Sequence, residues 1–182
     1  MEVPAIAQRC VAPLESSSTA ILTTAARLIF AGVLLFYFWN AGATKLGKGI
    51  FGFLNPDFGA YVQIFPKAVE AVGYDPSQLG TWHYLVVVAG TIAEFVLPLL
   101  IVIGLMTRLA AFGMVLFVII QTWTDVVGHG AWANGTFGTW FDRASDAVIA
   151  DQRAFWLLAL FILILKGAGP ISLDRLLFRN AT

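Results

Sequence analysis

The strongest constraint on this chain is a run over residues 84–106 in which Glu94 is the one charged side chain. A helix needs about 20 mostly apolar residues to cross the hydrocarbon core of a bilayer, so this run is long enough to do so. Hydrophobic residues make up 59% of the chain and charged residues 12%, against about 45–50% and about 25% in soluble proteins. Because so few charges could not cover a soluble domain, the sequence predicts an integral membrane protein.

Four apolar stretches predict an all-α integral membrane fold, a four-transmembrane-helix bundle that forms one membrane domain over residues 1–182. The expected spans lie at about 18–42, 82–105, 108–127 and 147–168. The last has the shortest uninterrupted apolar centre, the 12 residues between Arg153 and Lys166. Gly, Pro and Asp punctuate the segments 45–81 and 128–146, yet both are rich in aromatic residues. We expect amphipathic outer loops that lie on the bundle or at the membrane surface.

The lysines and arginines set the expected orientation. They are slightly more frequent in the chain ends and the short 104–108 hairpin than in the two long loops. Because basic residues favour the cytoplasmic side, we expect both termini, including the tail 169–182, in the cytoplasm. The loops 45–81 and 128–146 would then face outward.

Two charged residues, Arg27 and Glu94, lie deep inside predicted spans. A charge at the bilayer centre costs on the order of 3 kcal/mol. By helical rise, Arg27 lies roughly 15 Å into the first span and Glu94 roughly 20 Å from the hairpin at Thr107. A long arginine side chain could join the two in a buried ion pair, which would hold both in lipid. The alternative is that Glu94 binds a ligand or handles protons.

Small residues and one proline lie on the same helices. We expect Gly32, Gly42 and Gly47 on the first helix, and Gly90 on the second, to let helices approach closely in lipid. Pro98 is expected to bend the second helix one turn beyond Glu94.

Polar side chains gather near the outer ends of the first three helices. They are Asn40, Lys45, Lys48, His83, Gln121, Asp125 and His129. As a site, this outer polar cluster places acid, base and imidazole groups at a depth where a quinone head group could dock. The alternative is an ordinary interface, with lysines reaching the head groups and tryptophans forming an aromatic belt.

Several other site classes are disfavoured by simple counts. Two histidines and one aspartate in the cluster are too few to predict a metal site. The single cysteine, Cys10, excludes an intrachain dithiol. Because 11 basic residues balance 11 acidic ones, no nucleic-acid partner is expected.

Three motifs occur in order along the chain. The first helix reads RLIFAGVLLFYFWNAGATKL and carries Arg27, Gly32, Gly42 and Lys45. The second helix and hairpin read AEFVLPLLIVIGLMTRLAA and carry Glu94, Gly104, Thr107 and Arg108. The ending reads KGAGPISLDRLL and carries Gly167, Gly169, Ser172 and Asp174. From about residue 20 to residue 178, the sequence resembles the DoxX family.

The resemblance implies a four-helix bundle in the bacterial inner membrane. The family name descends from a subunit of a quinone-linked thiosulfate-oxidising system, and other members are associated with oxidative-stress complexes. The resemblance therefore implies a redox-associated protein that works as a subunit of, or partner to, a quinone-linked membrane complex, with quinone as a candidate ligand.

The residues themselves carry no recognisable catalytic motif. The alternative is a non-catalytic accessory subunit that packs against a larger respiratory or photosynthetic membrane complex. A third interpretation, a small-molecule or lipid transporter, has less support because the chain lacks inverted repeats.

Overall fold

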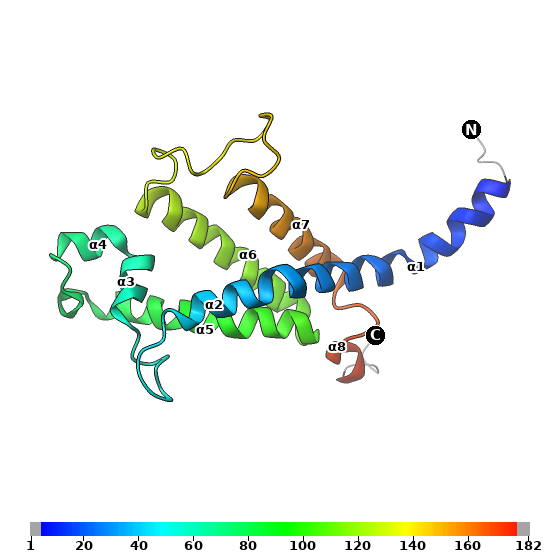
Figure 1. Cartoon of the computed structure of the whole chain (residues 1–182). Helices are drawn as coiled ribbons and strands as arrows, with labels where there is room; N and C mark the ends of the chain where they lie inside the picture. The colour runs from blue at the N-terminus through cyan, green and yellow to red at the C-terminus, as the bar shows by residue number, and fades with distance from the viewer. Residues whose placement is uncertain (1–4, 178–182) are drawn as a thin grey trace.

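The structure, a computed structural model, describes residues 5–177, and within that range it contains helices and no strand. The all-α prediction is therefore confirmed for the described part of the chain. In order, the elements are α1 Ala5–Phe30, η1 Ala31–Leu35, α2 Phe36–Ala43, α3 Phe58–Ile64, α4 Pro66–Ala71, η2 Pro76–Gln78, α5 Thr81–Ile103, α6 Thr107–Trp123, η3 Thr124–Gly128, α7 Ala150–Lys166 and α8 Leu173–Leu177 (Figure 1). The last five residues of the predicted tail lie outside the described range.

Three helical stretches in the described residues are long and apolar enough to cross a membrane: Ser17–Ala43, Thr81–Ile103 and Thr107–Gly128. They match the first three predicted spans closely. The first is continuous through the π-helical turn η1, and the third ends in the π-helical turn η3. The predicted fourth span is instead the 17-residue helix α7. At 1.5 Å per residue, it extends about 25 Å, slightly less than a typical hydrocarbon core.

The buried core lies where the first span, α6 and α7 meet. Phe38 packs edge to face against Phe117 and Trp156, with ring centroids 5.8 and 6.0 Å away. Phe30 and Met114 are also fully buried. Outward faces of the same helices carry large exposed apolar side chains, such as Phe36 and Ile120. This inside-and-outside hydrophobicity is typical of a bundle covered by lipid.

The two long connections lie at the same end of the bundle (Figure 1). The first predicted loop contains the short helices α3 and α4, of which α3 packs on α5. Asp57 caps α3 by accepting a hydrogen bond from the Gly59 amide at 2.9 Å, and Pro66 begins α4. The second connection is irregular. We call this end the pocket end and the opposite end, with the 104–106 hairpin and α8, the clasp end.

At the clasp end, Arg27 binds backbone carbonyls from two other parts of the chain. Its Nε donates to the Ile101 carbonyl at 3.0 Å, and Nη2 donates to the Val102 carbonyl. Its Nη1 donates to Ala168, at 3.1 Å, and to Ile171. The last carbonyls of a helix lack helical donors and carry partial negative charge. Arg27 therefore caps the end of α5 and fastens the segment after α7 to it.

Asp174 completes this clasp from α8. Its two carboxylate oxygens accept hydrogen bonds from the Met106 and Thr107 amides, at 2.6 and 2.9 Å. These amides begin α6, where a carboxylate also complements the helix dipole. Gly104 has φ +72°, and a Cβ there would lie 2.6 Å from the Ser172 Cβ and 2.9 Å from the Arg27 Cζ. The C-terminal motif thus locks the hairpin between the second and third spans.

The remaining motif glycines differ in their roles. A Cβ at Gly42 would lie 2.7 Å from the Phe95 ring, so close helix approach is confirmed there. Gly169, at φ +80°, leaves no room for a Cβ beside Thr23. For Gly32 the prediction is wrong, because the residue is exposed and an added Cβ would meet nothing within 4 Å. A Cβ at Gly90 would make only an ordinary contact, 3.8 Å from Ile64. For Gly47 the prediction is wrong, because the residue lies in the loop after α2, where it approaches the Asn55 carbonyl.

Removing the clasp carboxylate should destabilise the protein. Asp174→Ala leaves the first two amides of α6 without their acceptor, and we expect a loss of about 2 kcal/mol in the free energy of unfolding. Denaturant unfolding in detergent, followed by circular dichroism, measures it. Arg175→Ala is the control, because that residue is exposed next to Asp174. Equal stabilities of the two variants would contradict the capping role.

Candidate functional site

A pocket of about 480 Å³ opens between α2, α5 and α6 at the pocket end. Its apolar part is formed by facing residues of α5 and α6: Val86, Ala89, Gly90, Ala93, Leu97, Gly113, Leu116, Phe117 and Ile120. Its polar part brings together six side chains from separate segments: Lys45, Gln63, Glu94, Gln121, Asp125 and His129. Small residues on both helices make the room for this hollow. The pocket is therefore amphiphilic, with a polar end and an apolar slot.

A buried ion pair between Lys45 and Glu94 lies in the pocket wall. The Lys45 Nζ lies 2.8 and 2.9 Å from the two Glu94 carboxylate oxygens and 3.1 Å from the Ala41 carbonyl. The residues are 6% and 5% exposed. All three ammonium protons therefore have acceptors, which is what a buried lysine requires. The pair joins the end of the first span to the middle of the second.

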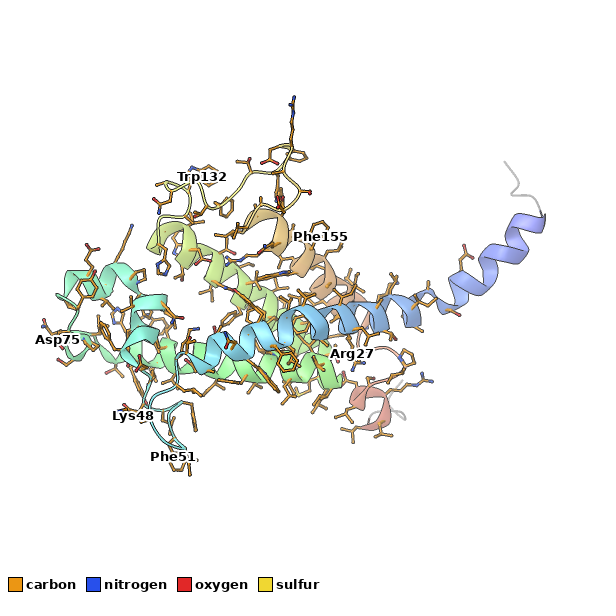
Figure 2. The ribbon with its side chains drawn as sticks, in the orientation of Figure 1. Arg27, Lys48, Phe51, Asp75, Trp132 and Phe155 are labelled. Atoms are coloured by element: carbon orange, nitrogen blue, oxygen red, sulfur yellow. The ribbon has the colours of Figure 1, made fainter. Side chains whose placement is uncertain are left out.

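The predicted pairing of Arg27 with Glu94 is wrong. Arg27 lies at the clasp end, where its guanidinium binds Ile101 and Val102 (Figure 2). Those residues are two helical turns from Glu94 along α5, or about 10 Å by helical rise. Arg27 and Glu94 are each held by a partner, as expected of charges inside a span, but the partners differ.

Hydrogen bonds tie the rest of the polar end together. The Gln121 amide donates to the Tyr37 hydroxyl at 3.1 Å, which links α6 to α2. The His129 Nε2 lies 2.9 Å from the Gln63 carbonyl and links the second connection to α3. Asp125, in η3, forms an ion pair with Arg153 of α7. The polar end is thus built by contacts between elements far apart in the sequence.

The structure gathers only part of the predicted outer polar cluster. Lys45, Gln121, Asp125 and His129 line the pocket together with Glu94. Asn40 and Lys48 are exposed and do not line it. His83 lies outside the lining, with its ring edge to face against Phe65 at 4.8 Å. The spacing of Asn40 and Lys48 from Lys45 turns them to other faces of the chain.

Arg153 is a residue of this region that sequence reasoning missed. It is 7% exposed, and its Nη1 donates to the Thr122 hydroxyl at 2.7 Å while Nη2 binds Asp125. The sequence placed Arg153 beside the apolar centre of the last predicted span, where a solvated charge is the usual expectation. One signal was available in the sequence: Asp125, at the end of the preceding helix, had no predicted partner of opposite charge, and Arg153 could supply one.

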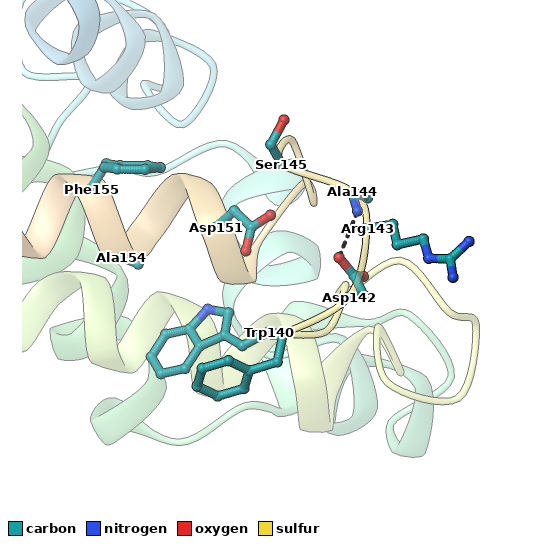
Figure 3. Close-up of a pocket in the computed structure, with 9 residues that line it drawn as sticks. Trp140, Asp142, Arg143, Ala144, Ser145, Asp151, Ala154 and Phe155 are labelled. Atoms are coloured by element: carbon teal, nitrogen blue, oxygen red, sulfur yellow. Dashed lines mark hydrogen bonds between the residues drawn. The ribbon is translucent and has the colours of Figure 1, made fainter.

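A second hollow, of about 490 Å³, lies beside the N-terminal end of α7 (Figure 3). Its carboxylates are used by the local backbone: Asp142 accepts from the Ala144 amide at 2.8 Å and Asp151 from the Ala147 amide at 3.1 Å. Arg143 points away from it (Figure 3). Because its polar groups do not converge, we take the amphiphilic pocket as the candidate site. Within the described residues, no group of three or more His, Cys, Asp or Glu side chains could hold a metal ion.

Together, these features define a helical membrane protein with an amphiphilic pocket between its spans. The family model for DoxX matches residues 21–127, which is more than half of the chain. The chain therefore belongs to the DoxX family. No curated protein and no solved structure matches it.

A double-mutant cycle should show which cation Glu94 pairs with. Lys45→Met leaves a buried carboxylate without its partner, and we expect a loss of about 3–5 kcal/mol in unfolding free energy. The double variant with Glu94→Gln should lose less than the sum of the single losses, with a coupling energy of about 1–3 kcal/mol.

The matched control is the cycle of Arg27→Leu with Glu94→Gln, which should be additive to within about 0.5 kcal/mol. Additive losses in the Lys45 cycle, measured by denaturant unfolding in the same detergent, would refute the observed pairing.

Proposed function

We propose that the amphiphilic pocket binds a quinone and that the chain acts as a subunit of, or partner to, a quinone-linked membrane complex. One observation carries this proposal: a buried ion pair and further polar groups close one end of a slot whose other end is apolar. A quinone has the same division, because a polar ring bears an apolar tail. Pockets for such ligands are mostly apolar with a few placed polar groups.

The polar end offers groups that suit a head group able to accept hydrogen bonds and protons. A quinone takes up two electrons and two protons when it is reduced. Lys45 and Glu94 bring an ammonium and a carboxylate to this end, joined by hydrogen bonds of 2.8 and 2.9 Å. Gln121 and His129 stand at the same end and orient polar atoms there. This chain would bind the head group and hold a proton, while a partner supplies the electrons.

We further infer that α7 is the fourth span, in the inner membrane of a bacterium, with both chain ends in the cytoplasm. The clasp supports an even number of crossings. Arg27, in the first half of the first span, contacts Ala168 and Ile171, which follow α7. The first half of the first span and the end of α7 therefore lie on the same side of the bundle. Figure 1 shows α7 running from the pocket end to the clasp end.

Filling the pocket should displace the quinone. Ala93 lines the pocket, and Ala93→Phe would occupy the space between α5 and α6. We expect the binding of an added short-chain quinone to weaken by roughly tenfold or more, about 1.4 kcal/mol. Titration of the detergent-purified protein measures it, together with the quinone that copurifies per chain.

Ile92→Phe is the matched control, because it introduces the same side chain at the preceding position, which is exposed. It should leave quinone binding unchanged. Equal quinone binding by the wild type and Ala93→Phe would exclude this pocket as the quinone site.

A second candidate function is that of a non-catalytic accessory subunit. The observation that favours it is the aromatic surface of the connection after α6, where Trp132 is 67%, Trp140 61% and Phe141 fully exposed. Purification from the native membrane in mild detergent, with mass spectrometry of every polypeptide and quinone, separates the two. A fixed-ratio partner without quinone favours the accessory subunit. Quinone bound to the chain favours the first proposal.

A further inference from the structure

The loop 47–55, directly after the first span, has a built shape that neither the clasp nor the pocket explains. Figure 1 shows it projecting sideways from the bundle near the end of α2. The Gly47 amide donates to the Gly52 carbonyl at 3.0 Å, and the Gly52 amide donates to the Gly49 carbonyl at 3.1 Å. A Cβ at Gly47 would collide with the Asn55 carbonyl, so only glycine permits this close approach. The loop is a compact turn with a defined tip.

The tip presents large apolar side chains and one cation. Ile50 is 92% exposed and Phe51 70% exposed. Figure 2 shows Phe51 at the extremity of the loop, with Lys48 beside the same turn. Leu54 adds further exposed apolar surface. A turn on a water-facing surface is ordinarily polar, so this tip is suited to an apolar environment.

The root of the loop is fastened to both neighbouring spans, which sets the height of the tip. The Lys45 side chain is held by Glu94, and its carbonyl accepts a hydrogen bond from the Asp57 amide at 3.0 Å. The Tyr84 hydroxyl, in the first turn of α5, donates to the Leu54 carbonyl at 2.8 Å. The first span ends at Ala43 and the second begins at Thr81. These contacts hold the loop between the level of Glu94, beside the end of the first span, and the level of Tyr84, in the first turn of α5.

We propose that the loop 47–55 is a membrane-interface anchor that inserts Ile50 and Phe51 between lipid head groups beside the first span. The lateral direction of the loop places its tip over lipid rather than above the bundle. The first span, directly before the loop, also exposes large apolar side chains, among them Val33 and Phe36. Lys48 suits the phosphate level, because a lysine ammonium reaches head groups while its stem stays in the apolar layer. This inference does not depend on the quinone pocket.

Spin labels on the full chain in liposomes of phosphatidylethanolamine and phosphatidylglycerol test the anchor. In a Cys10→Ser background, Phe51→Cys and, separately, Ile50→Cys receive a nitroxide. Collision rates with oxygen, which concentrates in lipid, are compared with those of a water-soluble nickel chelate. We expect oxygen to relax both labels more strongly than nickel does, the ordering of a lipid-embedded site.

Ser77→Cys is the matched control, an exposed position in η2 at the same end of the bundle, where nickel should dominate. A nickel-dominated signal at both positions 50 and 51 would overturn the proposal. Protection from both reagents, with spin-spin broadening that falls when unlabelled chain is added, would also overturn it, because a second copy would then cover the tip. Labelling two positions separately keeps the test valid if one variant fails to fold.

Discussion

The ion pair between Lys45 and Glu94 is the interaction on which the pocket end depends. A carboxylate in the middle of an apolar helix is unfavourable in lipid unless another group satisfies it. Here the required cation comes from the second residue beyond the first span, so pairing draws the start of the first long connection down onto α5. That contact roots the loop 47–55, sets one wall of the pocket and places α3 above it. Much of the geometry that makes the pocket polar at one end therefore follows from one buried charge.

The clasp end satisfies its buried cation differently. Arg27 has five donors in a planar fork, and the structure uses them on carbonyls rather than on a carboxylate. Carbonyls are plentiful where α5 ends and the chain turns after α7. Asp174 makes the complementary contact, an anion bound to amides at the start of α6. The two charged residues face opposite helix ends of a single hairpin, so the bundle joins its spans through backbone dipoles at one end and through a side-chain pair at the other.

The features of this structure that could be predicted are those that the amino-acid pattern encodes directly. The three long spans were predictable within a few residues, because apolar length is directly encoded. Glu94, Lys45, Gln121, Asp125 and His129, which line one pocket, could be singled out because polar groups near spans are rare. The backbone partners of Arg27 were not predictable. Every residue has a carbonyl, and the sequence does not show which few carbonyls the end of a helix leaves without a donor. The exclusion of Asn40 and His83 from the pocket depends on how each helix is rotated about its axis, and in the first span, which carries Asn40, the π-helical turn η1 alters that rotation.

The carbonyl partners of Arg27 also bear on how the chain is assembled. The arginine enters the membrane with the first helix, whereas two of its four acceptors, at Ala168 and Ile171, are synthesised only after α7. The acceptors on Ile101 and Val102 become available earlier, once α5 is in place. During synthesis the guanidinium must therefore stay near head groups or water until the later helices arrive. Two of the four hydrogen bonds that hold the first helix at this end can therefore form only after the segment that follows α7 has been made.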